Sequence, residues 1–279
     1  MIGETDLVTL NKIEMPEQRI NKEGFVTIAG AGPGDAELIT LKLQKRLTEA
    51  DVIITDRLVN PDIISDNVAK DALVLFAGKQ GYSDNSFSQQ EVTALILEHA
   101  EQGKRVLRLK GGDVAFFSNV LDELEALVEK NIPFEIIPGI TAASGASAYA
   151  GIPLTAREHS QGVQILTYNP TSYYNPETWK HLANSSNTLV FYMAAKNICD
   201  LAELILRYSK KPATKLAVIE QATTIHQQVH ITTLKDCAKD FADKSFSSPS
   251  LVIIGDVVKL HEQFSWFNNT EAGTIFQNL

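Results

Sequence analysis

Five short apolar segments in the first half of the chain most constrain what this sequence can fold into. They are dense in Val, Ile and Leu and span residues 25–29, 51–55, 72–77, 105–109 and 134–137. Such segments are typical of strands buried on both faces of a parallel sheet. Residues 39–50 carry apolar side chains at helical spacing, and we expect further helices at 88–102 and 119–130. Repeated strand–helix–strand units predict a parallel sheet.

The second half of the chain predicts a different sheet. We expect strands at 163–168, 188–193, 215–221, 227–232 and 251–258, and helices at 197–208 and 234–243. Because residues 227–232 alternate in polarity and lie close to their neighbour, this sheet is expected to be mixed. The connection Pro138-Gly-Ile-Thr141 leads into a predicted helix of small residues at 142–150, which could pack very close to another backbone.

These patterns predict an α/β protein of two domains. A chain of 279 residues is long enough for two modest domains. We expect an N-terminal α/β domain with the parallel sheet at 24–138 and a C-terminal α/β domain with the mixed sheet at 139–262. A polar extension at 1–23 precedes them, and a tail at 263–279 follows.

Composition and charge limit the classes of function. The formal net charge of −9 argues against nonspecific nucleic-acid binding, which needs a broad basic face. No run of about 18 apolar residues predicts a membrane span, and the first residues lack the features of a secretory signal. Two cysteines cannot form a disulfide framework, so we expect a reducing cytoplasm.

Two glycine-rich loops follow strands of the first predicted sheet, at the edge where open α/β sheets bind ligands. Gly30-Ala-Gly-Pro-Gly-Asp35 follows the first strand, and Arg108-Leu-Lys-Gly-Gly-Asp113 ends the fourth. Glycine leaves the backbone bare, so that a ligand can approach it closely. A small-molecule site is expected, although the first loop alone would suit a tight turn equally well. A nicotinamide enzyme is disfavoured, because the loop departs from G-x-G-x-x-G and Pro33 removes an N–H that a pyrophosphate needs.

Polar side chains at the same strand ends are candidates for acid–base chemistry. Asp56 could act as a general base while Arg57 holds an anionic substrate, but a helix cap or a surface ion pair would also explain the two residues. Lys79 could bind a carboxylate or donate a proton, whereas an isolated exposed lysine is usually only solvated. Asp113 follows two glycines and a strand with unusual polar residues, so a ligand-binding carboxylate is favoured there over a purely structural one.

The spacing of His226 and His230 would suit a metal if they lay on a helix. Their surroundings predict a strand, on which residues four apart stand too far from each other to chelate easily. No metal site is therefore predicted. Neither a Gly-x-Ser-x-Gly elbow nor a P-loop occurs, so hydrolase and kinase functions have no support.

Taken together, the motifs resemble the tetrapyrrole methylase family, and within it most closely the uroporphyrinogen-III C-methyltransferases. The matching pieces occur in order from residue 25 to residue 258. They are Val26-Thr-Ile-Ala-Gly-Ala-Gly-Pro-Gly-Asp35, Ala50-Asp-Val-Ile-Ile-Thr-Asp-Arg-Leu-Val59, Gly78-Lys79, Arg108-Leu-Lys-Gly-Gly-Asp113, Pro138-Gly-Ile-Thr-Ala-Ala-Ser144, Ala148-Tyr-Ala-Gly-Ile-Pro-Leu-Thr155 and Val190-Phe-Tyr-Met193.

The resemblance implies a homodimeric methyltransferase that binds S-adenosylmethionine in a cleft between two domains and releases S-adenosylhomocysteine. It implies methylation of uroporphyrinogen III at C2 and C7, giving precorrin-2 for sirohaem or cobalamin synthesis. The catalytic roles carry over to Asp56 as proton acceptor and Lys79 as proton donor. The cofactor contacts carry over to Pro33, Gly111, Gly112, Asp113, Phe116, Thr141, Ala142, Met193 and Ala222.

An acidic protein needs local cations to bind the carboxylates of such a tetrapyrrole. The candidates at the mouth of the cleft are Arg57, Lys79, Arg108 and Arg157. We expect no nucleic-acid partner and no membrane partner. Because no dehydrogenase–chelatase region accompanies the motifs, a stand-alone methylase is expected.

The chain also departs from the family pattern. After Gly-Gly-Asp the family has Pro-Phe-x-Phe-Gly-Arg-Gly, whereas this chain has Val114-Ala-Phe-Phe-Ser-Asn-Val120; the family's Thr-His-Arg is Thr155-Ala-Arg157 here. These changes lie where substrate would be held, so two alternatives remain open. One is a methylase of another tetrapyrrole such as a precorrin, and the other is a noncatalytic relative that binds cofactor or tetrapyrrole.

Overall fold

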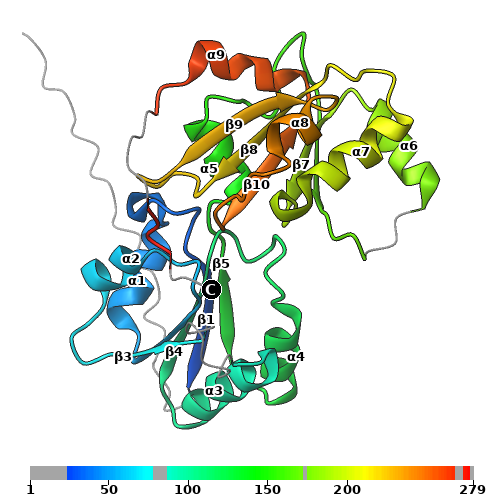
Figure 1. The fold of residues 1–279 in the computed structure, drawn as a ribbon. Coiled ribbons are helices and arrows are strands. Elements are labelled where there is room, and N and C mark those ends of the chain that lie inside the picture. Colours follow the sequence, from blue (N-terminus) through cyan, green and yellow to red (C-terminus); the bar gives the residue numbers. More distant parts are fainter. Residues whose placement is uncertain (1–23, 78–86, 172–174, 268–272, 277–279) are drawn as a thin grey trace, which may run out of the picture.

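Two five-stranded sheets organise the protein (Figure 1). The computed structural model describes residues 24–77, 87–171, 175–267 and 273–276. The first sheet has the strand order β3-β2-β4-β1-β5, and every neighbouring pair is parallel, as the apolar segments predict. Its strands are β1 (Phe25–Gly30), β2 (Val52–Thr55), β3 (Leu73–Phe76), β4 (Arg105–Lys110) and β5 (Phe134–Ile137).

Helices cover both faces of this parallel sheet. One face packs against α1 (Leu41–Glu49) and α2 (Pro61–Asn67), which follow a 3-10 turn at Ala36–Leu38. The other face packs against α3 (Gln89–Glu101) and α4 (Leu121–Glu129). Successive residues of β4 therefore point into two different cores, because strand side chains alternate between faces.

The second sheet has the order β6-β7-β10-β8-β9 and is mixed, as expected. Strands β6 and β7 are parallel, while β10 runs antiparallel to both β7 and β8, and β8 runs antiparallel to β9. The strand bounds are β6 (Val163–Thr167), β7 (Thr188–Tyr192), β8 (Lys215–Glu220), β9 (Gln228–Thr233) and β10 (Ser250–Ile254).

Helices also cover the second sheet on both faces. The small-residue helix α5 (Ala142–Tyr149) packs on one face, and α6 (Pro176–Asn184), α7 (Ile198–Tyr208) and α8 (Cys237–Phe241) pack on the other. A 3-10 turn at Ala195–Asn197 precedes α7; another, at Asp256–Leu260, precedes α9 (His261–Phe264). Helix α5 does make a close approach, because a Cβ on Gly145 would lie 2.5 Å from Cγ of Pro33. The expected domain limits at 24–138 and 139–262 stay a prediction.

Several expected elements differ from the structure. The strand expected at 251–258 ends at Ile254, because the chain turns at Gly255 into a 3-10 helix. The edge strands β3 and β5 are not buried on both faces, and Leu73 and Ile136 are each 44% exposed. Helices α2 and α6 were not expected, although each begins with the capping pair Asn-Pro. Among the described residues, no helix has the length and apolar character needed to cross a membrane.

Candidate active site

The loops that follow β1 and β4 meet at the carboxyl edge of the parallel sheet. Gly32 and Gly112 exchange two backbone hydrogen bonds, with N···O distances of 3.0 and 2.7 Å. The connection after β5 crosses directly beside them, so that a Cβ on Gly139 would lie 2.3 Å from the carbonyl oxygen of Gly112. Three backbones can approach this closely only because glycines occupy the contact.

The backbone at Gly112 has room for a side-chain carbon beside it. This residue has a φ of +70°, and the nearest atom to an added Cβ would be the Ala142 nitrogen at 3.9 Å. Its neighbour Gly111 is more crowded, since a Cβ there would lie 2.7 Å from Cβ of Leu58. The glycine pair therefore packs against protein at Gly111 and leaves room at Gly112, whose own N–H and carbonyl are both bonded to Gly32.

Asp113 fastens the loop after β4 to the connection after β5. It is only 6% exposed, and its Oδ1 accepts a hydrogen bond from the Ala115 N–H at 2.8 Å. Its Oδ2 accepts from the Gly139 N–H at 2.7 Å. The carboxylate thus has a structural role, which the sequence favoured less than ligand binding. Its contact with a cofactor stays a prediction.

The second sheet contributes the other side of the same region. The hydroxyl of Tyr192, at the end of β7, lies 2.6 Å from Oγ1 of Thr141 and accepts a hydrogen bond from the Ala143 N–H at 2.8 Å. The next residue, Met193, has a φ of +58° and is 66% exposed. The turn after β8 is fixed by Thr223, whose Oγ1 accepts from the Asp35 N–H at 2.9 Å.

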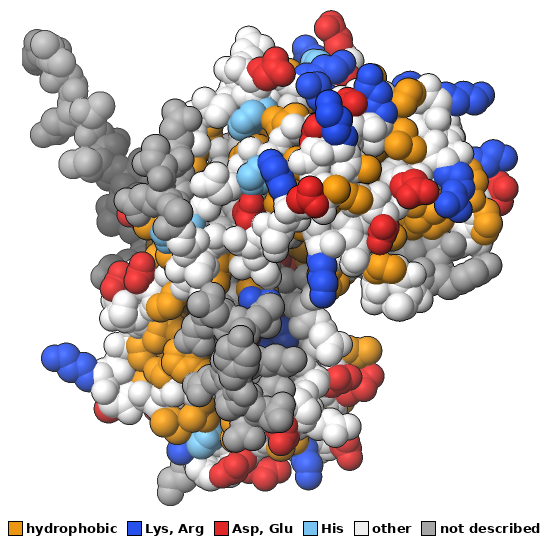
Figure 2. Space-filling view, in the orientation of Figure 1, with side chains coloured by type: hydrophobic (Ala, Val, Ile, Leu, Met, Phe, Trp, Pro, Cys, Tyr) orange, Lys and Arg blue, Asp and Glu red, His pale blue; other side chains and the backbone are white. Residues whose placement is uncertain are grey.

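The positions predicted to contact the cofactor therefore lie on loops that touch one another. They follow β1, β4, β5, β7 and β8, and are Pro33, Gly111, Gly112, Asp113, Phe116, Thr141, Ala142, Met193 and Ala222. Figure 2 shows a recess between the two sheet-bearing parts, with Lys and Arg side chains visible inside it. The room beside Gly112 and the exposed thioether of Met193 fit a cofactor that offers apolar surface without phosphate.

The loop that departs from the family pattern also reaches across to the second sheet. The rings of Phe117 and Tyr192 lie 5.0 Å apart between centroids. Phe117 and Asn119 have φ values of +52° and +51°, which are uncommon for residues with a side chain. The left-handed residue Asn119 also delays the start of α4 to Leu121, two residues later than expected.

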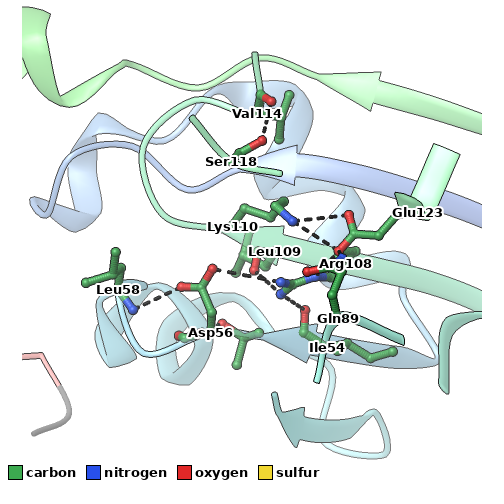
Figure 3. Close-up of polar contacts among 11 residues, drawn as sticks. Ile54, Asp56, Leu58, Gln89, Arg108, Leu109, Lys110, Val114, Ser118 and Glu123 are labelled. Atoms are coloured by element: carbon green, nitrogen blue, oxygen red, sulfur yellow. Dashed lines mark hydrogen bonds and ion pairs between the residues drawn. The ribbon is translucent and has the colours of Figure 1, made fainter. Parts of the chain in front are cut away.

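Asp56 is the predicted proton acceptor and lies at the end of β2. Its Oδ1 accepts a hydrogen bond from the Leu58 N–H at 3.0 Å, and its Oδ2 lies 4.0 Å from Nη2 of Arg108 (Figure 3). Its side chain is 27% exposed, so solvent or a substrate can reach it. The predicted proton donor, Lys79, lies outside the described residues.

Arg57 is half-buried beside Asp56 and reaches toward the second sheet. One of its Nη2 hydrogens is donated to Oγ of Ser248, with a distance of 3.3 Å. Burial lowers the pKa of its guanidinium, and the negative charge of Asp56 opposes that effect. Arg157, another candidate for binding substrate, is exposed on the tight turn closed by mutual backbone hydrogen bonds between Ala156 and Ser160.

The expectation that Arg108 is a cation at the mouth of the cleft is wrong. Arg108 is 5% exposed, and its Nε donates to Oε1 of Glu123 at 3.1 Å. Lys110, two residues along the same strand, points to the same side, with Nζ 3.0 and 3.2 Å from the two oxygens of Glu123. Both side chains enter the core beneath α3 and α4 because alternate residues of β4 face that way.

Burial gives this charged cluster unusual electrostatics. The pKa of Lys110 is lowered, first by burial and then by the positive charge of Arg108, although Glu123 opposes both. Two cations, Arg108 and Lys110, are matched by two carboxylates, Asp56 and Glu123, so the group has no net charge. Glu123 was not predicted as a site residue from the sequence. Its spacing of four from Leu127, which places both on the buried face of α4, was the available signal.

One histidine of the pair, His230, has a carboxylate partner. His230 lies on β9, as the sequence predicts, and its Nε2 is 2.6 Å from Oε1 of Glu220. Within the part of the chain that the structure describes, no group of three or more His, Cys, Asp or Glu side chains could hold a metal ion.

Comparison with known proteins agrees with the fold and with the resemblance. The family of tetrapyrrole (corrin/porphyrin) methylases matches residues 26–238. Siroheme synthase 2 of Yersinia enterocolitica is 41% identical over 254 residues, which are 91% of this chain and 53% of that protein. The chain thus spans about half the length of the curated relatives it matches.

Two solved structures have the same fold. Uroporphyrin-III C-methyl transferase from Thermus thermophilus, complexed with S-adenyl homocysteine, aligns with a TM-score of 0.70 and 29% identity over 85% of this chain and 94% of that chain. A cobalt precorrin-4 methyltransferase of cobalamin biosynthesis aligns with a TM-score of 0.75 and 25% identity, over 84% and 95% of the two chains. The chain therefore belongs to the tetrapyrrole methylase family, and its predicted class, a methyltransferase that uses S-adenosylmethionine, is confirmed at the level of that family.

Proposed function

We propose that this protein methylates uroporphyrinogen III at C2 and C7, using S-adenosylmethionine and giving precorrin-2 for sirohaem or cobalamin synthesis. The observation that carries the proposal is the contact among the five loops that hold the predicted cofactor positions, with Asp56 at the neighbouring strand end. The relative from Thermus thermophilus, named for uroporphyrin III, supports the choice of substrate.

The chemistry asks the protein mainly to align two reactants. When bound, S-adenosylmethionine supplies a methyl group activated by a sulfonium centre. Correct alignment can supply up to about 7–11 kcal/mol of the barrier. The room left beside Gly112 and the exposed side chains of Phe116 and Met193 would orient the reactants in this way.

Carbon–carbon bond formation at the pyrrole leaves a proton to be removed. Asp56 is the group proposed to accept it, because its Oδ2 faces Arg108 while the carboxyl remains partly open to solvent. Lys79 is proposed as the proton donor. Arg57 and Arg157 remain candidates for binding the substrate's carboxylates, whereas the Arg108 guanidinium is bonded to Glu123 inside the protein.

A methylation assay tests the proposal directly. The full chain is incubated with uroporphyrinogen III and S-adenosylmethionine labelled in its methyl group, and we expect two labelled methyl groups per macrocycle, at C2 and C7. Binding of S-adenosylhomocysteine without any incorporation would instead identify a noncatalytic relative.

The altered loop at Val114–Val120 favours a second candidate. Asn119 and Ala156 stand where the resemblance places an arginine and a histidine, so a tetrapyrrole with a different arrangement of polar groups would fit this chain. Incorporation into a precorrin, with none into uroporphyrinogen III, would establish that alternative. We also propose a homodimer and a cytoplasmic setting, which light scattering of the purified chain and cell fractionation would test.

A further inference from the structure

Glu123 is the centre of a buried polar cluster that the proposed reaction does not use directly. Its side chain is fully buried, and it projects from α4 toward the end of β4 (Figure 3). Its Oε1 accepts hydrogen bonds from Arg108 Nε at 3.1 Å, Lys110 Nζ at 3.0 Å and Gln89 Nε2 at 3.1 Å. One carboxylate oxygen on α4 thus accepts from three donors, two on strand β4 and one on helix α3.

Three hydrogen bonds, one of them to Glu123, hold the Arg108 guanidinium in its orientation. Besides Nε, the Nη1 group is held by the carbonyl oxygens of Leu109 at 3.0 Å and Ile54 at 3.3 Å. A guanidinium is planar, so holding Nε and Nη1 also sets the direction of Nη2. In this structure Nη2 faces Oδ2 of Asp56 at 4.0 Å.

This separation is longer than a direct hydrogen bond. Arg108 therefore supplies positive charge beside Asp56 without binding both of its oxygens, and Oδ1 is held by the Leu58 N–H. A proton acceptor needs this combination, because a carboxylate locked in a bidentate arginine pair offers no free oxygen to a substrate.

We propose that Glu123 is a positioning residue, which holds Arg108 at the distance from Asp56 that keeps the proton acceptor oriented and available. The proposal rests on the proposed methylation and extends it to a residue outside the recess. Glu123 acts through Arg108, and Lys110 supplies the second positive charge that makes a buried carboxylate tolerable at this point.

The central experiment compares Glu123→Gln with Glu125→Gln. Glu125 lies on the same helix but is exposed, so Glu125→Gln makes the same chemical change at a position without buried contacts. For Glu123→Gln we expect kcat to fall on the order of tenfold to a hundredfold, as small misplacements of a catalytic group do. KM for the tetrapyrrole and the affinity for S-adenosylhomocysteine should change by less than about twofold, because neither binds to Glu123.

Two further variants separate positioning from charge balance. Glu123→Asp keeps the negative charge but shortens the side chain, so an intermediate kcat is expected. The double variant Lys110→Gln with Glu123→Gln removes one charge of each sign. If the double variant regains wild-type kcat, Glu123 serves only to neutralise Lys110, and the proposal is overturned.

A crystal structure of Glu123→Gln supplies a readout that is independent of activity. We expect the Arg108 guanidinium to rotate and its Nη2 to move relative to Asp56. An unchanged guanidinium, or a kcat within twofold of wild type, would refute the positioning role. If Glu123→Gln does not fold, Glu123→Asp takes the same tests. If the wild-type chain methylates no tetrapyrrole, the proposed function fails, whereas the structural comparison still decides whether Glu123 orients Arg108.

Discussion

The two faces of the parallel sheet are built from the same strands and both bury apolar cores, but only the face beneath α3 and α4 also buries charged side chains. On the side of α1 and α2, Leu107 and Leu109 of β4 pack into an apolar core with Leu43 and Leu47. On the side of α3 and α4, the alternate residues Arg108 and Lys110 enter a core that also contains the buried carboxylate of Glu123.

This difference separates what stabilises the fold from what serves the site. Apolar burial stabilises by about 1.5–3 kcal/mol for each large side chain, so the α1–α2 face needs no other explanation. A buried ion pair often contributes no more stability than apolar residues of similar volume. The charged face is therefore better explained by its connection to Asp56 than by stability.

The largest expected effect is a loss of activity when the proposed proton acceptor is replaced. Replacing Asp56 with Asn removes the proposed proton acceptor but keeps the shape of the side chain, and kcat should fall by about 10²–10⁴-fold. Steady-state methylation kinetics would measure the loss, with S-adenosylhomocysteine affinity as the control for an intact cofactor site. A kcat close to wild type would show that another group accepts the proton.

A substitution in the apolar core beside α1 and α2 should lower stability while leaving activity unchanged. Leu107 is fully buried, and Leu107→Ala should lower the free energy of unfolding by about 2–5 kcal/mol, through lost burial and the cavity left behind. Urea denaturation measures this loss, and kcat measured where the variant remains folded should stay near wild type. A large fall in kcat in the folded variant would mean that both faces serve the site.

Replacing the three buried members of the charged cluster by apolar residues tests whether the cluster contributes to stability. The triple variant Arg108→Met, Lys110→Met and Glu123→Leu removes all the charges that Glu123 gathers. We expect its free energy of unfolding to be equal to that of wild type or higher by about 1–4 kcal/mol. A loss of stability of several kcal/mol in denaturant melts would instead show that the cluster holds the fold together.

The smallest effect is expected from an exposed ion pair on the same strand. Arg105 binds Asp51, and their side chains are about half exposed, so Asp51→Asn should cost only about 0.2–1 kcal/mol. Hydrogen bonds from the Arg105 side chain lower the pKa of Asp51 below its usual value. The stability that the ionised carboxylate contributes is therefore present above pH 4 and lost as the pH falls further. Denaturant melts of the two proteins should converge on acidification, and a gap that persists at acid pH would contradict this assignment.

Much of the fold follows from local patterns in the sequence. Dense Val, Ile and Leu segments identify the strands of the parallel sheet, because strands covered on both faces require them. The same rule fails at the edge strands, where neighbours cover only part of β3 and β5. The missed helices α2 and α6 had a usable signal in Asn60-Pro61 and Asn175-Pro176.

The candidate site was harder to predict from the sequence than the fold. The glycine loops were recognised because glycine allows close approach of the backbone and conformations that other residues avoid. Arg108 was expected at the mouth of the cleft because an anionic tetrapyrrole needs local cations, and only the position of Glu123 in space reveals its partner. A partner 15 residues away on another element leaves no local pattern.

The crossing of the loops at Gly32, Gly112 and Gly139 limits how this enzyme could be altered by directed evolution. A side chain at Gly139 would push apart two loops at once, so single substitutions there should be lost from any library. Gly112 has space for a side chain but a left-handed backbone, which Asn and Asp tolerate better than other residues. At the proposed cofactor site, substitution is thus most accessible as Asn or Asp at Gly112, in combination with changes at exposed Met193.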